Sequence, residues 1–297
     1  MFKKIGLAVI GLLGLLLTFG SDGAYETTLF TSGEERPTIV MSHNSWDDGI
    51  GSTAVIANVL EDNGFDIDKV QLDPAVLVSS IATGDSDVST VPWSITHSAY
   101  LEEYEGQYIN MGAHTEGALS GAVVPTYMED VNHITDLTDE ANQTFTSIEP
   151  GAVIVDQAEE AIATYDNLSD WTVHPSSTGA MLTELEQAYA NEEEIVMTGW
   201  KPHWKFIEYD LKMLEEPEGA FLKGDDLLKI AREGFREDYP VASQIIDNFT
   251  WSMEDVQTVM TYLQEDGITP SEAGRRWMDE NPEQVASWTE GVEGLEE

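Results

Sequence analysis

Short apolar segments alternate with segments of helical periodicity along most of the chain, and this alternation restricts the possible folds more than any other feature. In the first third, strands are predicted over Thr38–Met41, Lys69–Leu72 and Val88–Val91, and helices over Ala54–Leu60 and Pro74–Ala82. Strands that alternate with helices pair in parallel, because each helix returns the chain to the starting end of the sheet. The pattern therefore predicts an α/β fold.

The alternation returns in the middle of the chain. Strands are predicted over Leu119–Val124, Phe145–Ile148, Trp171–His174 and Glu194–Thr198, with helices over Val155–Tyr165 and Thr178–Tyr189. From about Asp225 onward the sequence is expected to be nearly all helical, with helix-ending signals that begin at Gly234. The expected organisation is two α/β lobes followed by a helical tail.

The charge and the absence of cysteine exclude several classes of function. The chain has 13 Lys and Arg against 56 Asp and Glu, which gives a formal net charge of −43. Nucleic acid is excluded as a partner because its binding requires cationic side chains that neutralise phosphates. Without cysteine there is no disulfide, thiolate nucleophile or lipid-modified cysteine. Acidic surfaces of this kind are typical of proteins from salty surroundings, where salt screens the repulsion.

Residues 1–23 have the layout of a secretory signal peptide. Lys3-Lys4 gives a positive start, Ile5–Phe19 is an uncharged apolar run, and small residues follow within Gly20–Gly23. The apolar run is shorter than the ~20 residues that span a bilayer, so cleavage is favoured over an uncleaved anchor. The mature protein is therefore expected in the periplasm, with no lipobox cysteine to hold it on a membrane.

Three tryptophans, Trp46, Trp93 and Trp200, lie at the carboxyl ends of predicted strands, where open α/β sheets bind ligands. For any one of them, packing in or beside the core is the more common role. Three tryptophans at equivalent strand ends indicate that they contribute to one binding site. Indole faces attract desolvated cations, and a cage of them suits a quaternary ammonium, which has no N–H to donate.

The segment Glu149–Ile154 has features of an anion-binding site, in contrast to the tryptophans, which suit a cation. Its Pro-Gly turn precedes a predicted helix, and a helix start presents free backbone N–H groups at the positive end of the helix dipole. An ordinary strand-to-helix connection has the same sequence, so the motif alone is weak. Together with a tryptophan cage it indicates a zwitterion that carries a quaternary nitrogen and a carboxylate.

Motifs of catalysis or metal binding are not found. The histidines show no zinc spacing, and there is no nucleophile elbow, phosphate-binding loop or dinucleotide fingerprint. We therefore expect no catalytic residue, no metal, no cofactor and no enzyme activity. The histidines concerned are His43, His97, His114, His133, His174 and His203.

Several motifs together resemble the glycine betaine/proline betaine-binding proteins of ABC importers. They are Asn44-Ser45-Trp46-Asp47, Val91-Pro92-Trp93 with His97, Glu116–Pro125, Glu149-Pro150-Gly151, Thr198-Gly199-Trp200-Lys201-Pro202-His203-Trp204 and Tyr209–Pro217. The run from Thr198 to Trp204 is the most specific of them. The resemblance covers most of the chain from about residue 38 to 290.

This resemblance implies a two-lobed periplasmic-binding-protein fold, type II-like, with the ligand in the cleft between the lobes. Lobe I would comprise residues 36–122 plus 212–297, and lobe II residues 123–211, with hinge strands at Ser120–Pro125 and around Tyr209–Leu214. Lobe closure on the ligand would then present it to the permease subunits of an ABC importer.

By the same resemblance, Trp46, Trp93 and Trp200 would surround the quaternary ammonium. His97 and the backbone amides of Val153 and Ile154 would hold the carboxylate.

Two departures from the family pattern fall on the carboxylate side. Val153 stands where a glycine is usual, and the spacing from Trp93 to His97 is one residue shorter than expected. The alternatives to glycine betaine are therefore choline, carnitine or a sulfonium analogue. A sensory binding protein of the same fold, a secreted hydrolase or lyase acting on choline-type substrates, and a structural surface protein are the alternatives to transport.

Overall fold

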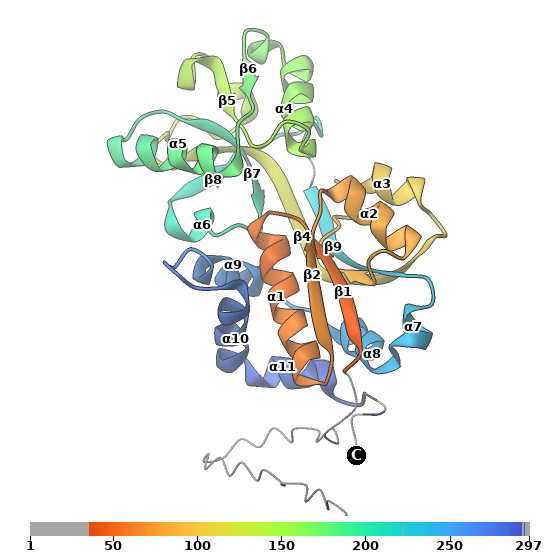
Figure 1. Ribbon diagram of the computed structural model, residues 1–297. Helices are drawn as coiled ribbons and strands as arrows, with labels where there is room; N and C mark the ends of the chain where they lie inside the picture. Colours follow the sequence, from red (N-terminus) through yellow and green to blue (C-terminus); the bar gives the residue numbers. More distant parts are fainter. Residues whose placement is uncertain (1–35, 222, 293, 295–297) are drawn as a thin grey trace, which may run out of the picture.

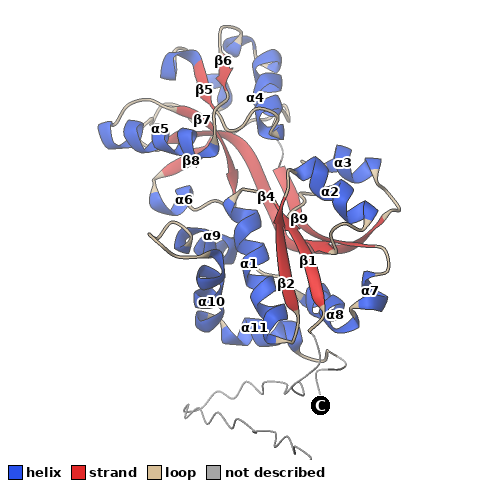
Figure 2. Cartoon of the chain, viewed as in Figure 1, coloured by secondary structure: helices blue, strands red, loops and turns tan. Residues whose placement is uncertain are grey.

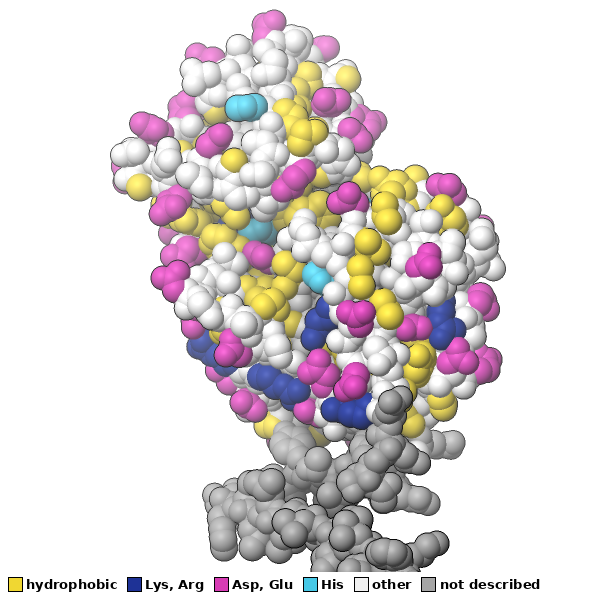
Figure 3. All heavy atoms as spheres, viewed as in Figure 1, with side chains coloured by type: hydrophobic (Ala, Val, Ile, Leu, Met, Phe, Trp, Pro, Cys, Tyr) yellow, Lys and Arg dark blue, Asp and Glu magenta, His cyan; other side chains and the backbone are white. Residues whose placement is uncertain are grey.

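A computed structural model describes residues 36–221, 223–292 and 294 (Figure 1). The predicted signal peptide, residues 1–23, lies outside the described residues. In the part of the chain that is described, no helix combines the length and the apolar character needed to cross a membrane. Figure 3 shows acidic side chains scattered over the visible face rather than gathered in one patch, as expected for a solvated acidic surface.

The described strands form one mixed sheet, in the order β2-β1-β3-β9-β4-β7-β5-β6, with β8 paired to β4. Their bounds are β1 Thr38–His43, β2 Asp66–Gln71, β3 Val88–Ser89, β4 Tyr108–Pro125, β5 Thr144–Thr146, β6 Thr172–His174, β7 Val196–Lys201, β8 Leu211–Met213 and β9 Lys223–Arg232. The pairs β1–β2, β1–β3, β5–β6 and β5–β7 are parallel, whereas β4 and β9 run antiparallel to their neighbours.

The α-helices cover both ends of this sheet (Figure 2). Their bounds are α1 Asp47–Asp62, α2 Pro74–Thr83, α3 Ser98–Glu103, α4 Val153–Thr164, α5 Thr178–Asn191, α6 Lys205–Glu208, α7 Phe235–Asp238, α8 Pro240–Asn248, α9 Met253–Tyr262, α10 Pro270–Glu280 and α11 Pro282–Thr289. Short 3₁₀ helices occupy Ile134–Asp136, Glu140–Gln143 and Asp166–Leu168. The predicted α/β alternation is thus present in both halves of the fold.

Two strands are poorly predicted by the sequence. β4 has 18 residues, of which the sequence pattern predicts only the last part. β9 occupies Lys223–Arg232, where a helix is expected, so the prediction of a nearly all-helical segment from Asp225 is wrong at its start. Successive β9 residues enter different cores, Leu227 one and Leu228 another. Because both faces of this strand are buried, its apolar residues do not alternate with polar ones.

The buried hydrophobic residues divide the molecule into two bodies. One cluster gathers residues 118–221 together with Trp93 and Leu227. Two other clusters gather residues 39–111 and 228–292. β4 joins the bodies, because its Tyr108–Leu119 part pairs with β9 and its Leu119–Val123 part pairs with β7. In Figure 1, α4, α5, β5 and β6 lie in one body and α1, α2 and α8 to α11 in the other.

Candidate functional site

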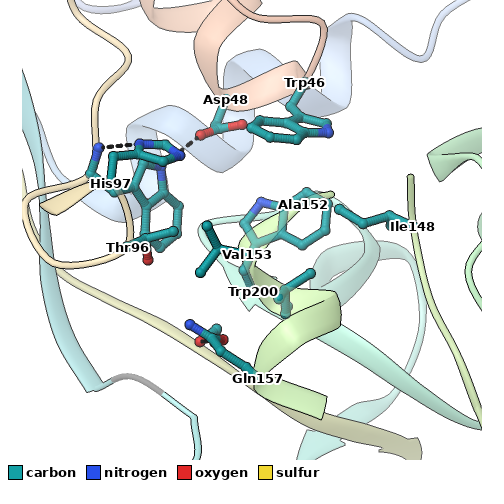
Figure 4. Close-up of a pocket in the computed structure, with 12 residues that line it drawn as sticks. Trp46, Asp48, Thr96, His97, Ile148, Ala152, Val153, Gln157 and Trp200 are labelled. Atoms are coloured by element: carbon teal, nitrogen blue, oxygen red, sulfur yellow. Dashed lines mark hydrogen bonds between the residues drawn. The ribbon is translucent and has the colours of Figure 1, made fainter. Parts of the chain in front are cut away.

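A cavity with about 460 Å³ of empty space, its open mouth included, lies between the two bodies. The cavity is lined by Trp46, Asp48, Trp93, Thr96, His97, Ser120, Ile148, Ala152, Val153, Ile154, Gln157 and Trp200. All six ligand-binding residues predicted from the sequence are therefore brought together around one space. Figure 4 shows Trp46 and Asp48 on one side of it and Val153 and Gln157 on the other.

Trp46 and Asp48 reach the cavity from the start of α1. Trp46 is the residue before the helix, and its backbone N–H donates to Asn44 Oδ1 at 3.1 Å. The Asn44 side chain passes so close to the helix that a Cβ atom on Gly49 would lie 2.2 Å from Oδ1. Glycine at this position therefore permits the contact that fixes the entry into α1. Trp46 Nε1 lies 3.5 Å from Glu149 Oε2 in the other body.

A residue of β9 holds the segment from Trp93 to His97 in place. Asp225, which is 0% exposed, accepts five hydrogen bonds through its carboxylate, from donors at 2.7–2.9 Å. The donors are Ser94 Oγ, Ile95 N, Thr96 N, Thr96 Oγ1 and Asp226 N. A buried carboxylate with this many donors orders the loop between Trp93 and His97.

Asp48 is buried beside the indole of Trp93. Trp93 Nε1 donates to its Oδ2 at 3.2 Å, whereas its Oδ1 has no hydrogen-bond partner among the described residues. Burial raises the pKa of Asp48 to about 6, although the hydrogen bond from Trp93 acts in the opposite direction. At neutral pH a negative charge therefore stands in the wall of the cavity, only partly compensated by the protein.

His97 has a defined tautomer. The backbone N–H of Trp93 donates to His97 Nδ1 at 2.9 Å, so in the neutral ring the proton is on Nε2 (Figure 4). Burial lowers the pKa of His97 to about 4, against an opposing effect of Asp225. At neutral pH the ring is therefore uncharged and offers one N–H donor. The four-residue spacing from Trp93 permits this local contact.

Trp200 comes from the other body. It lies within β7, opposite Ser120 of β4, and is 7% exposed. The sequence analysis ends this strand at Thr198, but Gly199 and Trp200 continue the pairing with β4. The imidazole of His203 contacts the indole edge-on, with ring centroids 4.8 Å apart. Trp200 is thus fixed by the sheet as well as by side-chain packing.

The start of α4 supplies backbone donors. Gly151, with φ of 91°, reverses the chain before Ala152, and the helix begins at Val153. The amides of Val153 and Ile154 have no carbonyl one turn back within the helix. Neither of them donates to another described residue. One turn later, Gln157 faces the cavity, with its Oε1 accepting from Ser120 Oγ at 2.7 Å.

Half of the residues that line the cavity are not predicted as site residues from the sequence. They are Asp48, Thr96, Ser120, Ile148, Ala152 and Gln157. Gln157 carried a usable signal, because it lies four residues after Val153 and therefore on the same face of the predicted helix. Asp48 lies two residues after Trp46, a spacing that does not place two side chains on one helix face, so it carried no such signal. Ser120 carried none, since its place beside Gln157 depends on the pairing of β4.

The described residues hold no group of three or more His, Asp or Glu side chains that could bind a metal ion. The cavity instead combines aromatic faces, one buried carboxylate and several N–H donors.

Comparison with known proteins gives the family. Over residues 37–280 the chain matches the substrate binding domain of ABC-type glycine betaine transport systems (OpuAC). It is 41% identical over 162 residues to the glycine betaine/carnitine transport binding protein GbuC of Listeria monocytogenes serotype 1/2a (strain 10403S). This match covers 54% of this chain and 54% of GbuC, so it spans about half the length of that relative.

Two solved structures are similar over nearly their whole length. Lactococcal OpuAC in its closed-liganded conformation, complexed with glycine betaine, has a TM-score of 0.81 and 36% identity, covering 86% of this chain and 100% of that chain. A glycine betaine, L-proline-binding protein (ProX) from Borrelia burgdorferi has a TM-score of 0.79 and 25% identity, covering 87% and 99%. The chain has the periplasmic-binding-protein fold and belongs to the family of substrate-binding domains of ABC-type glycine betaine transport systems.

Proposed function

We propose that this protein captures glycine betaine or a related quaternary ammonium compound in the cavity between its two bodies and delivers it to an ABC importer. The observation that carries the proposal is the convergence of Trp46, Trp93 and Trp200 with the buried carboxylate of Asp48. The lactococcal relative was solved with glycine betaine, and GbuC is named for glycine betaine and carnitine.

The aromatic wall suits the cationic end of such a ligand. A quaternary ammonium has no N–H group, so it needs no hydrogen-bond acceptor and gives up no N–H hydrogen bond to water when it enters an aromatic cage. Asp48 adds a negative charge at the same wall, and its burial makes this charge more effective than one in water. The cage favours a cation over a neutral solute of the same shape.

The carboxylate end would be held by neutral donors. His97 offers its Nε2–H, and Val153 and Ile154 offer the first amides of α4 at the positive end of the helix dipole. Because none of these groups carries a full charge, they can bind a carboxylate without excluding a ligand that has a hydroxyl instead. Choline, which has a hydroxyl group, and carnitine, which has both a hydroxyl and a carboxylate, are therefore the competing ligands.

Ligand binding would close the two lobes. We take lobe I as residues 36–122 plus 212–297 and lobe II as 123–211, with hinges at Ser120–Pro125 and around Tyr209–Leu214. Trp46 and Trp93 belong to the first lobe and Trp200, Val153 and Ile154 to the second, so each end of the ligand would contact both lobes. Such a ligand stabilises the closed form over the open one. Closure can then signal the bound state to the permease.

The location follows from the same proposal. Cleavage after the apolar segment within residues 1–23 would release the mature protein into the periplasm, where a binding protein meets both solute and permease. The net charge of −43 suits high salt, in which uptake of a compatible solute is useful. The cavity has donors and aromatic faces but no nucleophile paired with a base, which supports binding without turnover.

Calorimetric titration of the mature protein tests the proposal. Glycine betaine, choline and carnitine are titrated in high salt into the wild type, Trp200→Leu and Trp171→Leu. Trp171 is a buried indole packed on Phe145 outside the cavity, so it provides the same substitution away from the ligand. We expect one-to-one binding of glycine betaine to the wild type and to Trp171→Leu, and no measurable binding to Trp200→Leu.

Binding of choline but not of glycine betaine or carnitine would retain the cage and reject the carboxylate contacts. Absence of binding of all three by a wild type that shows a cooperative unfolding transition would overturn the proposal. Release of a new product during incubation with any of them would favour an enzyme.

A further inference from the structure

Lys205 is a fully buried lysine that packs on a tryptophan of the cavity. It is the first residue of α6, is 0% exposed, and is not part of the cavity lining. Its Nζ lies 4.4 Å from the ring centroid of Trp200 and 5.6 Å from that of Phe206. Within the described residues Nζ has no hydrogen-bond acceptor. The ammonium group therefore depends on aromatic faces for its stabilisation.

The backbone near Lys205 leaves room for its amine to reach the Trp200 indole. The side chain passes over Gly199, where a Cβ atom would lie 3.2 Å from Lys205 Cε and 2.7 Å from Val123 Cγ2. The backbone N–H of Lys205 donates to His203 Nδ1 at 3.2 Å. Glycine at position 199 thus leaves the space through which the amine reaches the Trp200 indole.

The other fully buried lysine shows what an ordinary structural role looks like. Lys229 is 1% exposed, and its Nζ donates to the backbone carbonyls of Asp247 and Phe249, each at 2.9 Å. These bonds satisfy the end of α8, a common use of lysine. Lys205 has no such task, although an unpaired buried amine is costly to the folded state.

Few charged groups act on Lys205. Asp47 at the start of α1 is the opposite charge that favours its protonation, but the Asp47 carboxylate accepts hydrogen bonds from Trp204 Nε1 and Gln264 Nε2. His203 lies beside it, and burial keeps the pKa of His203 well below its usual range, so that ring is neutral. Lys201 Nζ lies 4.5 Å from the Phe206 ring.

Two cations on one indole oppose each other. A cation over an aromatic ring is attracted by the negative face of the ring, and a second cation near the same ring meets a weakened attraction and a direct repulsion. Trp200 is shared by both, because it lines the cavity and packs on Lys205. We propose that Lys205 sets the affinity of the tryptophan cage for cations, and that its ammonium and a cation in the cavity exclude each other.

The proposal makes cation binding a proton-linked event near neutral pH. Burial lowers the pKa of Lys205 to about 7, with Asp47 acting against it. Below this pH the amine is charged and weakens the cage; above it the amine is neutral and the cage is at full strength. By linkage, a cation that binds in the cavity must expel a proton from Lys205.

The test rests on the proposed function and measures its proton dependence. Tetramethylammonium chloride and glycine betaine are titrated at constant ionic strength between pH 6.5 and 8.5 into the wild type, Lys205→Met and Lys201→Met. Tetramethylammonium isolates the cage because it lacks a carboxylate. Lys201→Met removes the same charge next to Trp200 in sequence, without an amine over that indole.

For both probes we expect the dissociation constant of the wild type to fall about fourfold across this range, because the neutral fraction of an amine with a pKa of about 7 rises by about that factor. Lys201→Met should keep this dependence. Lys205→Met should bind tightly at all these pH values and lose the dependence. Titrations in two buffers of different ionisation enthalpy should show proton release by the wild type at pH 7 and none by Lys205→Met.

A wild type whose affinity is constant over this range, or a Lys205→Met variant that keeps the wild-type dependence, would overturn the proposal. Failure of every probe to bind at any pH instead counts against the proposed function. A second measurement needs no ligand. The unfolded state holds its proton up to higher pH than the folded state, so wild-type stability should rise from pH 7 to 9 and exceed that rise in Lys205→Met. Equal rises would exclude a buried titrating amine.

Discussion

Two buried aspartates contact the same stretch of chain and differ in how completely they are bonded. Asp225 accepts five hydrogen bonds, four of them from backbone and hydroxyl groups between Trp93 and His97 and the fifth from Asp226 N. Asp48 accepts the indole N–H of Trp93 through one oxygen, and its other oxygen has no hydrogen-bond partner in the part of the chain that the structure describes. Both are almost fully buried, at 0% and 1% exposed.

The difference separates a positioning residue from a residue that faces the ligand. A carboxylate whose acceptors are all occupied stabilises the fold and has no remaining capacity for a solute. A buried carboxylate with an unbonded oxygen lowers the stability of the folded state, and its charge remains able to attract a cationic ligand in the cavity. The comparison therefore predicts opposite results for the same substitution at the two positions.

The largest effect is expected for Asp225→Asn. An amide group in place of one oxygen faces N–H and O–H donors and cannot accept from them. We expect the free energy of unfolding to fall by about 3 kcal/mol, and ligand affinity to fall with the disordered Trp93 segment. Urea unfolding and calorimetry measure the two. Asp226→Asn, at the next and less buried position, is the control and should lose less than about 1 kcal/mol.

Asp48→Asn is expected to lower ligand affinity without lowering stability. The side chain keeps an oxygen for Trp93 Nε1 but loses its charge, so the unfolding free energy at pH 7 should not decrease. Affinity for glycine betaine should fall about tenfold or more, because a buried charge near the ammonium is removed. The same two measurements apply. A loss of stability as large as that of Asp225→Asn would contradict the assignment of Asp48 to the ligand.

The pH dependence sharpens the contrast. Because burial raises the pKa of Asp48 to about 6, the folded state binds more protons than the unfolded state between about pH 4 and 6. The contribution of Asp48 to stability is therefore present at low pH and lost as the pH rises through 6, whereas cation affinity should increase over the same range. In the Lys205→Met background, which removes the other titrating group, titrations at pH 5, 6 and 7 should show this increase, and the added Asp48→Asn substitution should abolish it.

The smallest effect is expected for Ser94→Ala, which removes one of the donors to Asp225. Four accepted hydrogen bonds remain on this carboxylate. The unfolding free energy should fall by about 1 kcal/mol, with affinity changed less than about twofold. An affinity loss comparable to that of Asp225→Asn would show that the Trp93 segment depends on this one hydroxyl.

The sequence by itself determined the features that depend on neighbours along the chain. The spacing of apolar residues predicted the α/β alternation, including helices at Pro74–Ala82 and Thr178–Tyr189, close to the observed Pro74–Thr83 and Thr178–Asn191. Local patterns also predicted that Trp46, Trp93 and the start of α4 lie at the edge of a sheet. Hydrophobic periodicity and turn residues act within a few positions, so one sequence is enough to recognise them.

Only the tertiary structure decided which groups meet. β9 is a strand because β3 and β4 pair with it on both sides, and both its faces are buried. Asp225 reaches Ser94 across 131 residues. Lys205 lies over Trp200 because Gly199 leaves room for its side chain. Charge, burial and hydrogen bonding depend on contacts between distant segments, and no local pattern in the chain records those contacts.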